Sequence, residues 1–105
     1  MAAPHPFHSH HRQGFVRVAA CTPRIHVGDP QANAKETVAL MRDGEKRNVD
    51  LMVFPELGLS AYAIDDLLLQ EALLDGVEAA LATLLEASRG LRTVCIVGAP
   101  VRRNH

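Results

Sequence analysis

Three short apolar runs separated by two long helical stretches constrain the fold of this chain more than any other feature. The runs are residues 14–21 (GFVRVAAC), 49–54 (VDLMVF) and 93–100 (TVCIVGAP). Apolar strands that alternate with helices are typical of a parallel sheet with right-handed crossovers. We therefore predict an α/β fold in the order strand, helix, strand, helix, strand, with strands apolar enough to be buried on both faces.

The two ends of the chain indicate its domain organisation. Four of the six histidines lie within residues 5–11 (HPFHSHH). His-rich tracts can bind metal, but no Cys, Asp or Glu completes a site here, so residues 1–13 are interpreted as a flexible His-rich tail. The third apolar run ends close to residue 105, with no helix after it to cover its face. Residues 14–105 are therefore expected to be the opening, incomplete part of a larger α/β domain.

A start signal places the first helix. Asp29 followed by Pro30 is typical of a helix N-terminus, with a capping side chain and then a proline in the first turn. The pattern predicts a helix over residues 30–46, with Ala34, Val38 and Met41 on one face. Gly44 and the charged residues after it are expected to weaken its last turn.

The second helical stretch covers residues 64–90. Two acidic residues at 65 and 66 suit a helix N-terminus, and Arg89-Gly90 is typical of a C-terminal stop. Gly76 is expected to divide the stretch into two helices, with Asp75 as the cap of the second. The core-facing stripe of that second helix is predicted to be Leu74, Val77, Leu81, Leu84 and Leu85.

Charge and hydropathy exclude several classes of partner. The formal net charge is −1 and 48% of the residues are hydrophobic, which favours neither nucleic acid nor an anionic membrane surface as a partner. The chain has no apolar run of about 18 residues, and no secretory signal is visible at its N-terminus. Cys21 and Cys95 both lie in apolar runs, which is typical of buried free thiols in a reducing compartment. We expect a cytoplasmic protein.

One acidic residue stands where catalytic groups gather in this class of fold. Glu56 lies in VFPELGLSAY (53–62), directly after the second apolar run and Pro55. Functional groups of open α/β sheets collect at the carboxyl ends of the strands. The apolar flanks of Glu56 would desolvate its carboxylate and raise its pKa, which suits a general base near neutral pH. The alternative from spacing alone is a loop carboxylate that caps or forms an ion pair with a neighbouring segment.

Other candidate groups are weaker. Neither G-x-x-x-x-G-K nor G-x-G-x-x-G occurs, and Ser60 lacks the pattern of a nucleophile elbow. Cys21 could pair with His26 as a nucleophile and base, but a buried thiol at a strand end is the commoner case. Asp65 and Asp66 could bind a cation, although adjacent helical carboxylates point to different sides, which favours capping.

The stretch around Glu56 resembles the first catalytic motif of the nitrilase, or carbon–nitrogen hydrolase, superfamily. More narrowly, the chain is similar to the N-terminal amidase domains of bacterial glutamine-dependent NAD synthetases. The matching stretches are GFVRVAAC (14–21), VGDPQANA (27–34), VFPELGLSAYAIDDLLLQEALLDGVEAAL (53–81) and VGAPVR (97–102). They lie across nearly the whole chain after residue 13, and PELGLSAYAIDDLLLQ is specific to the synthetase branch.

The resemblance implies a fold and a reaction. The fold would be the opening portion of a nitrilase-type α-β-β-α sandwich, with three strands and two to three helices in this chain. Glu56 would be the general base of a Glu–Lys–Cys triad in which a thiol attacks the carboxamide of L-glutamine and a lysine stabilises the oxyanion. Tyr62 matches a family tyrosine near the glutamine pocket.

The resemblance also implies partners beyond this chain. The released ammonia would pass to an ATP-dependent domain that amidates deamido-NAD. No cofactor is expected in residues 14–105, since ATP and Mg would bind in that further domain, and the complete enzyme is expected to be a homo-oligomer.

Two departures from the family pattern bear on the site. The lysine and cysteine motifs of the triad do not occur in these 105 residues, and neither Cys21 nor Cys95 has the context of the family nucleophile. Ala61 stands where the family usually has glycine, so a positive φ there would strain the loop. Two alternatives to the synthetase therefore stay open, namely another carbon–nitrogen hydrolase and a non-catalytic α/β module.

Overall fold

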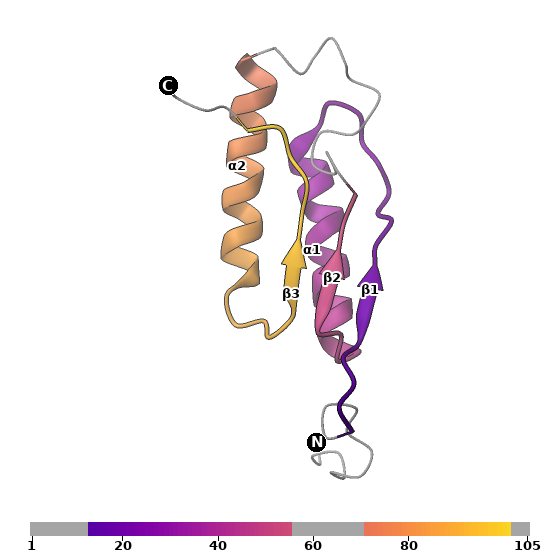
Figure 1. Cartoon of the computed structure of the whole chain (residues 1–105). Coiled ribbons are helices and arrows are strands. Elements are labelled where there is room, and N and C mark those ends of the chain that lie inside the picture. The colour runs from indigo at the N-terminus through magenta and orange to yellow at the C-terminus, as the bar shows by residue number, and fades with distance from the viewer. Residues whose placement is uncertain (1–12, 56–70, 102–105) are drawn as a thin grey trace.

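The order of elements in the structure is the predicted one. A computed structural model describes residues 13–55 and 71–101. Its elements are β1 (Val18–Ala20), α1 (Pro30–Lys46), β2 (Leu51–Val53), α2 (Glu71–Ser88) and β3 (Val94–Ile96). The strands pair in parallel in the order β1-β2-β3, with β2 in the centre (Figure 1). The predicted α/β class is therefore confirmed, with strands that are shorter than the apolar runs that contain them.

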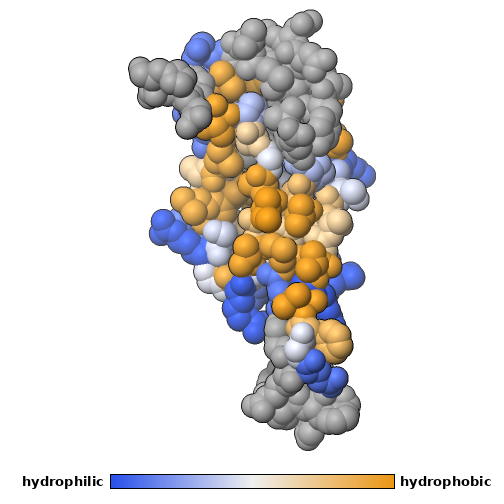
Figure 2. All heavy atoms as spheres, viewed as in Figure 1, coloured by the Kyte–Doolittle hydropathy of each residue, from blue (hydrophilic) through white to orange (hydrophobic). Residues whose placement is uncertain are grey.

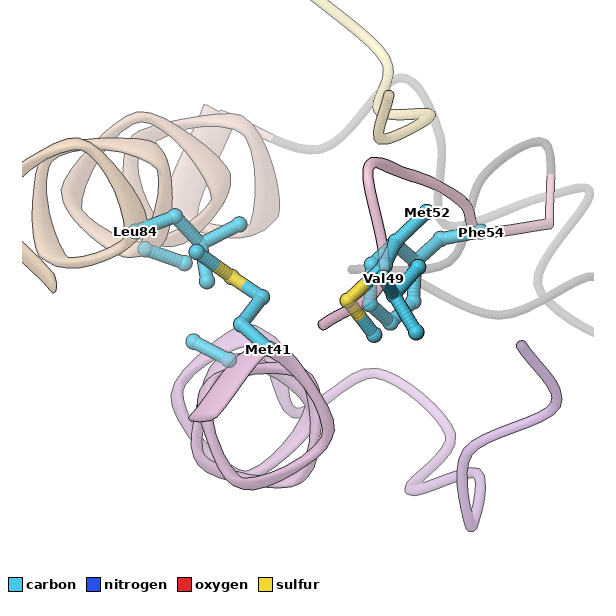
Figure 3. Packing of buried hydrophobic residues seen from close by; sticks show 7 residues of the cluster. Met41, Val49, Met52, Phe54 and Leu84 are labelled. Carbon is cyan, nitrogen blue, oxygen red and sulfur yellow. The ribbon is translucent and has the colours of Figure 1, made fainter. Parts of the chain in front are cut away.

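One face of the sheet packs against both helices. Helices α1 and α2 contact each other and cover the same face, so the two crossovers have the same hand. Strand residues alternate between faces, and the paired row Ala19, Met52 and Cys95 is the row that packs on the helical core. Met52 is only 2% exposed and shares this core with Met41 of α1 and Leu84 of α2 (Figure 3).

The opposite face of the sheet is apolar and open. Val18, Val94 and Ile96 lie there with 56%, 60% and 53% of their surface exposed. Figure 2 shows hydrophobic residues gathered over the strands on this face. The strands are apolar on both faces, as predicted, but in the described residues the helices cover one face only, which agrees with the expectation of an incomplete domain.

Helix α1 begins and ends as local chemistry dictates. The side chain of Asp29 caps it by accepting a hydrogen bond from the Ala32 amide, and Pro30 occupies the first turn. At the other end Asn48 adopts φ 58°, the Asn48 amide donates to the Glu45 carbonyl, and the Val49 amide donates to the Gly44 carbonyl. These two bonds form a Schellman motif, with the buried Val49 as its apolar residue. The predicted bounds of α1 are confirmed.

Helix α2 is continuous through Gly76, so the predicted division into two helices capped by Asp75 is wrong. A Cβ at Gly76 would lie 3.4 Å from the Pro30 ring, which shows that the glycine lies against the start of α1. The predicted stripe is correct for Val77 and Leu84, which are buried, whereas Leu85 is 64% exposed. Gly90, with φ 83°, follows the helix end as predicted.

Candidate active site

The residues predicted to carry chemistry fall largely beyond what the structure describes. Glu56, Ala61 and Tyr62 lie outside the described residues, and so do the acidic pair at 65–66 and the His-rich tract. Their roles stay predictions. The structure does describe the strand that leads to Glu56, through Phe54 and Pro55, and the segments that surround the end of that strand.

The carboxyl end of β2 is held on both sides. The Cys21 amide donates to the Val53 carbonyl at 2.8 Å, and the Phe54 amide donates to the Ile96 carbonyl at 2.9 Å. These bonds extend the parallel ladder beyond the strand ends. Phe54 is 6% exposed and belongs to the buried core cluster, which also contains Ala34 and Ala80. The chain therefore leaves the centre of the sheet from a rigid point, two residues before Glu56.

A loop over residues 21–29, here called the β1–α1 loop, borders the same edge. Its conformation is fixed by Asn33 in the first turns of α1. The Asn33 side chain accepts from the His26 amide and donates to the His26 carbonyl, both at 2.8 Å. The ring of His26 also lies beside the Glu36 carboxylate, with Nε2 and Oε1 3.3 Å apart. Three bonds thus join one loop residue to α1.

The two cysteines fit a structural role. Both thiols are free and half-buried, and burial raises the pKa of Cys21 and, as its main cause, that of Cys95. A raised pKa disfavours the thiolate, which is the nucleophilic form. The Cys21 thiol donates to the Ala19 carbonyl at 3.8 Å, while the His26 ring pairs with Glu36. The structure therefore gives no support to a Cys21–His26 pair.

The opposite edge of the sheet holds a second polar cluster, which ties α1 to the start of β3. Glu45 accepts from the amides of Arg92 and Thr93, both at 3.1 Å, and from the Thr93 hydroxyl at 2.8 Å and Arg92 Nε at 3.2 Å. The Thr93 bonds contribute most to lowering the Glu45 pKa. The cluster borders a hollow of about 190 Å³. It lies at the amino ends of the strands, away from the carboxyl end of β2.

Sequence reasoning missed both Asn33 and Glu45. Asn33 was visible only as a polar residue at a position where the helical period of α1 places the core, and it is 2% exposed. Glu45 carried no signal, because its partners are 47 and 48 residues away.

Two features are absent from the described residues. In residues 13–55 and 71–101, no group of three His, Cys, Asp or Glu side chains is arranged to hold a metal ion. Nor does a helix within those ranges have the length and apolar character needed to cross a bilayer.

Comparison with known proteins identifies the family to which this chain is similar. The model of the carbon–nitrogen hydrolase family matches residues 17–105. Glutamine-dependent NAD(+) synthetase of Mycobacterium tuberculosis is 50% identical over 99 residues, which cover 94% of this chain. The proteins of the same name from Mycobacterium leprae and Thermotoga maritima are 46% and 32% identical, over 94% and 79% of this chain.

The matched region is a small part of these relatives. This chain spans 15% of the length of the mycobacterial proteins and 14% of the Thermotoga protein. The family match, by contrast, covers most of this chain, and the parallel β-α-β-α-β layer agrees with it. The chain belongs to the carbon–nitrogen hydrolase family.

Proposed function

We propose that this chain forms the N-terminal part of the glutaminase domain of a glutamine-dependent NAD synthetase. The observation that carries the proposal is 50% identity, over 94% of this chain, to a relative with that name. The domain would hydrolyse the side-chain amide of L-glutamine. The ammonia would serve an ATP-dependent amidation of deamido-NAD in a further domain, where ATP and Mg would bind.

In this proposal Glu56 is the general base. It would take the proton from a cysteine thiol, which then attacks the carboxamide carbon of glutamine and forms a tetrahedral intermediate. A lysine would stabilise the oxyanion, and collapse of the intermediate would release ammonia and leave a thioester. Water would hydrolyse the thioester to glutamate. Neither Cys21 nor Cys95 has the sequence context of the family nucleophile, and the lysine and cysteine motifs do not occur here, so in this proposal both groups would lie outside these 105 residues.

The fold supports this placement of the base. Glu56 follows the central strand, and the end of that strand is anchored by the buried Phe54 and by ladder bonds to both neighbouring strands. A rigid approach limits the positions that a catalytic side chain can take, which is what general-base catalysis needs. The open apolar face of the sheet would be covered by the second sheet of the sandwich.

The family match alone also fits an amidase that acts without a synthetase domain. The two functions differ in the fate of the ammonia. Only the synthetase couples amide hydrolysis to ATP-dependent amidation, whereas a stand-alone amidase releases ammonia to solvent. The two free thiols fit the reducing cytoplasm in either case.

A chimera tests the proposal. This chain replaces the 99 matched residues of the Mycobacterium tuberculosis relative, and NAD formation is measured with glutamine and with free ammonia. Both activities are expected in the chimera. Glu56→Gln should lower the glutamine-dependent rate by about 10²–10⁴, because it removes the proton acceptor and keeps the shape.

The ammonia-dependent rate is the internal control. Ammonia bypasses the amidase step, so the Glu56→Gln chimera should keep this rate within about twofold. Equal loss of both activities would show a structural role for Glu56, and full retention of both would show that it is not the base.

A further inference from the structure

The outer edge of β3 offers backbone groups that no strand of the described sheet uses. The Val94 amide donates to the Asp50 carbonyl at 2.9 Å, on the side of β2. The Ile96 carbonyl accepts from the Phe54 amide on the same side, also at 2.9 Å. Alternate residues of a strand bond to the same neighbour in a parallel ladder, so the amide and carbonyl of Cys95 point to the other side. Because β3 is the last strand of the described sheet, that side is an open edge.

An apolar groove of about 220 Å³ lies beside this edge. Its lining includes Leu81 and Leu85 of α2, Met41 of α1, and Cys95 and Val97 in and after β3. Figure 2 shows hydrophobic surface over α2 next to the strands. A strand added to the edge of β3 would direct every second side chain toward this groove. Recognition at a sheet edge commonly combines backbone bonds and side-chain pockets in this way.

Helix α2 has a second apolar side, which borders the groove. Its buried side contains Val77 and Leu84, whereas Leu81 and Leu85 lie one turn apart along the flank. Leu85 is 64% exposed and Leu81 is half-buried. A single exposed leucine needs no explanation, but this one continues the apolar lining of a groove at an open strand edge.

A second copy of β3 matches this edge in charge and in side-chain pattern. Residues 93–97 (TVCIV) contain no charged residue and no proline, which are groups that protect an edge strand from pairing. Antiparallel pairing of this segment with its own copy therefore brings no like charges together. The copy would also continue both faces of the sheet, with Cys95 on the helix side and Val94 and Ile96 on the open side.

We propose that two copies of this chain pair through the outer edges of their β3 strands, antiparallel and about a two-fold axis, to form one continuous sheet. The axis is perpendicular to the sheet, so the helices of both copies lie on one face and the two α2 helices are adjacent. Leu81 and Leu85 of each copy then cover the groove at the junction. The inference does not depend on the proposed glutaminase function, because it involves only the described elements.

Sedimentation equilibrium of the 105-residue chain tests this interface. The parent chain should dimerise as its concentration is raised over about a hundredfold range. Leu85→Glu, which puts a carboxylate of each copy near the axis, should raise the dissociation constant at least about tenfold. Thr83→Glu is the matched control, because Thr83 is exposed and lies about 200° away around the same helix. It should change the dissociation constant by less than about threefold.

Association through the open face of the sheet is measured separately. That face stays uncovered in the proposed dimer, so it can join dimers into larger species. Val94→Thr with Ile96→Thr alters the open face and keeps the outer-edge backbone. These changes should lower the amount of species larger than a dimer and leave the dimer.

A disulfide between copies reports the strand pairing. Pairing centred on β3 places the two Cys95 residues opposite each other with Cα atoms about 5.5 Å apart, which a disulfide can bridge. Both cysteines of the chain are free thiols. Diamide should join two chains, since it takes up the two protons and two electrons that the thiols lose as the S–S bond forms. Cys21→Ser should keep this covalent dimer, and Cys95→Ser should lose it.

Each result decides the proposal. A parent chain that stays monomeric would overturn it, as would equal dissociation constants for Leu85→Glu and Thr83→Glu. Cys21→Ser without a diamide-linked dimer, or Cys95→Ser with one, would also overturn it. Circular dichroism shows whether Leu85→Glu folds, and the disulfide test, which leaves α2 unsubstituted, decides the question if it does not.

Discussion

The contact between Gly44 and Met52 allows us to predict how one substitution changes the free energy of unfolding. In an exposed helix, Gly→Ala stabilises by about 1 kcal/mol. Here, a Cβ on Gly44 would lie 2.3 Å from Met52 Sδ and 2.9 Å from Cε. Normal contacts between such atoms are about 3.5–4.0 Å, so the methionine tip must move by more than about 1 Å.

The burial of Met52 decides the sign of the effect. A methionine tip is flexible, but Met52 is 2% exposed and lies with Val49 and Phe54 in the core cluster (Figure 3), so its movement displaces core neighbours. Overpacking of this kind costs about 1–3 kcal/mol. Set against the propensity gain, Gly44→Ala should destabilise by about 0–2 kcal/mol. In a Met52→Val background, which lacks Sδ and Cε, the same change should stabilise by about 1 kcal/mol.

Urea unfolding followed by circular dichroism measures all four members of this cycle. The 105-residue chain is used at one fixed low concentration, since association would couple to unfolding. Gly76→Ala is the control, because its Cβ would make only a 3.4 Å contact with Pro30, and it should be neutral or stabilising. The reasoning is refuted if Gly44→Ala stabilises equally in both backgrounds, since that would mean no overpacking.

Two further predictions follow from the Glu45 cluster and from the open face of the sheet. The bonds to Glu45 lower its pKa in the folded chain, so they stabilise the fold above the unfolded pKa of about 4.3, and this stabilisation is lost as the pH falls through the lower folded value. Glu45→Gln should therefore reduce the fall of Tm as the pH drops below about 5. An unchanged dependence of Tm on pH would contradict a stabilising role for the bonds to Glu45. The open face should make the isolated chain self-associate, and Val94→Thr with Ile96→Thr should weaken this, as measured by sedimentation velocity. A parent chain that sediments as a monomer at all concentrations would count against this reading of the face.

Features governed by near neighbours in the sequence were predictable. The start of α1 follows from Asp29 and Pro30, which adjoin the helix in the sequence. Its end was predicted at residue 46 from Gly44 and the charged residues after it, whereas the left-handed Asn48 that closes the helix is a finding of the structure. The parallel order of the strands follows from the spacing of apolar runs, because helices of this length return the chain to the same edge.

Features governed by distant partners were not predictable. Gly76 is a helix breaker by local propensity, yet it lies inside α2, where its missing side chain gives room to Pro30 of α1. Asn33 resembles any polar residue until its partner in the preceding loop is known. The role of Glu56 as a base stays a prediction that rests on a resemblance. A strand, a proline and a glutamate do not by themselves distinguish a catalytic carboxylate from a capping one.

The Glu45 cluster also affects how this layer of the protein forms. The first strand–helix–strand unit ends at Val53, but the carboxylate in its helix meets Arg92 and Thr93 only after the second unit has been added. Glu45 and Arg92 are 47 residues apart, so bringing them together closes a long loop and costs conformational entropy. Other contacts that form at the same time must offset this cost. The last turn of α1 and the start of β3 therefore stabilise each other. During synthesis on a ribosome, α1 would emerge before Glu45 can bond to Arg92 and Thr93. The three strands would become one cooperative unit when Thr93 bonds to Glu45.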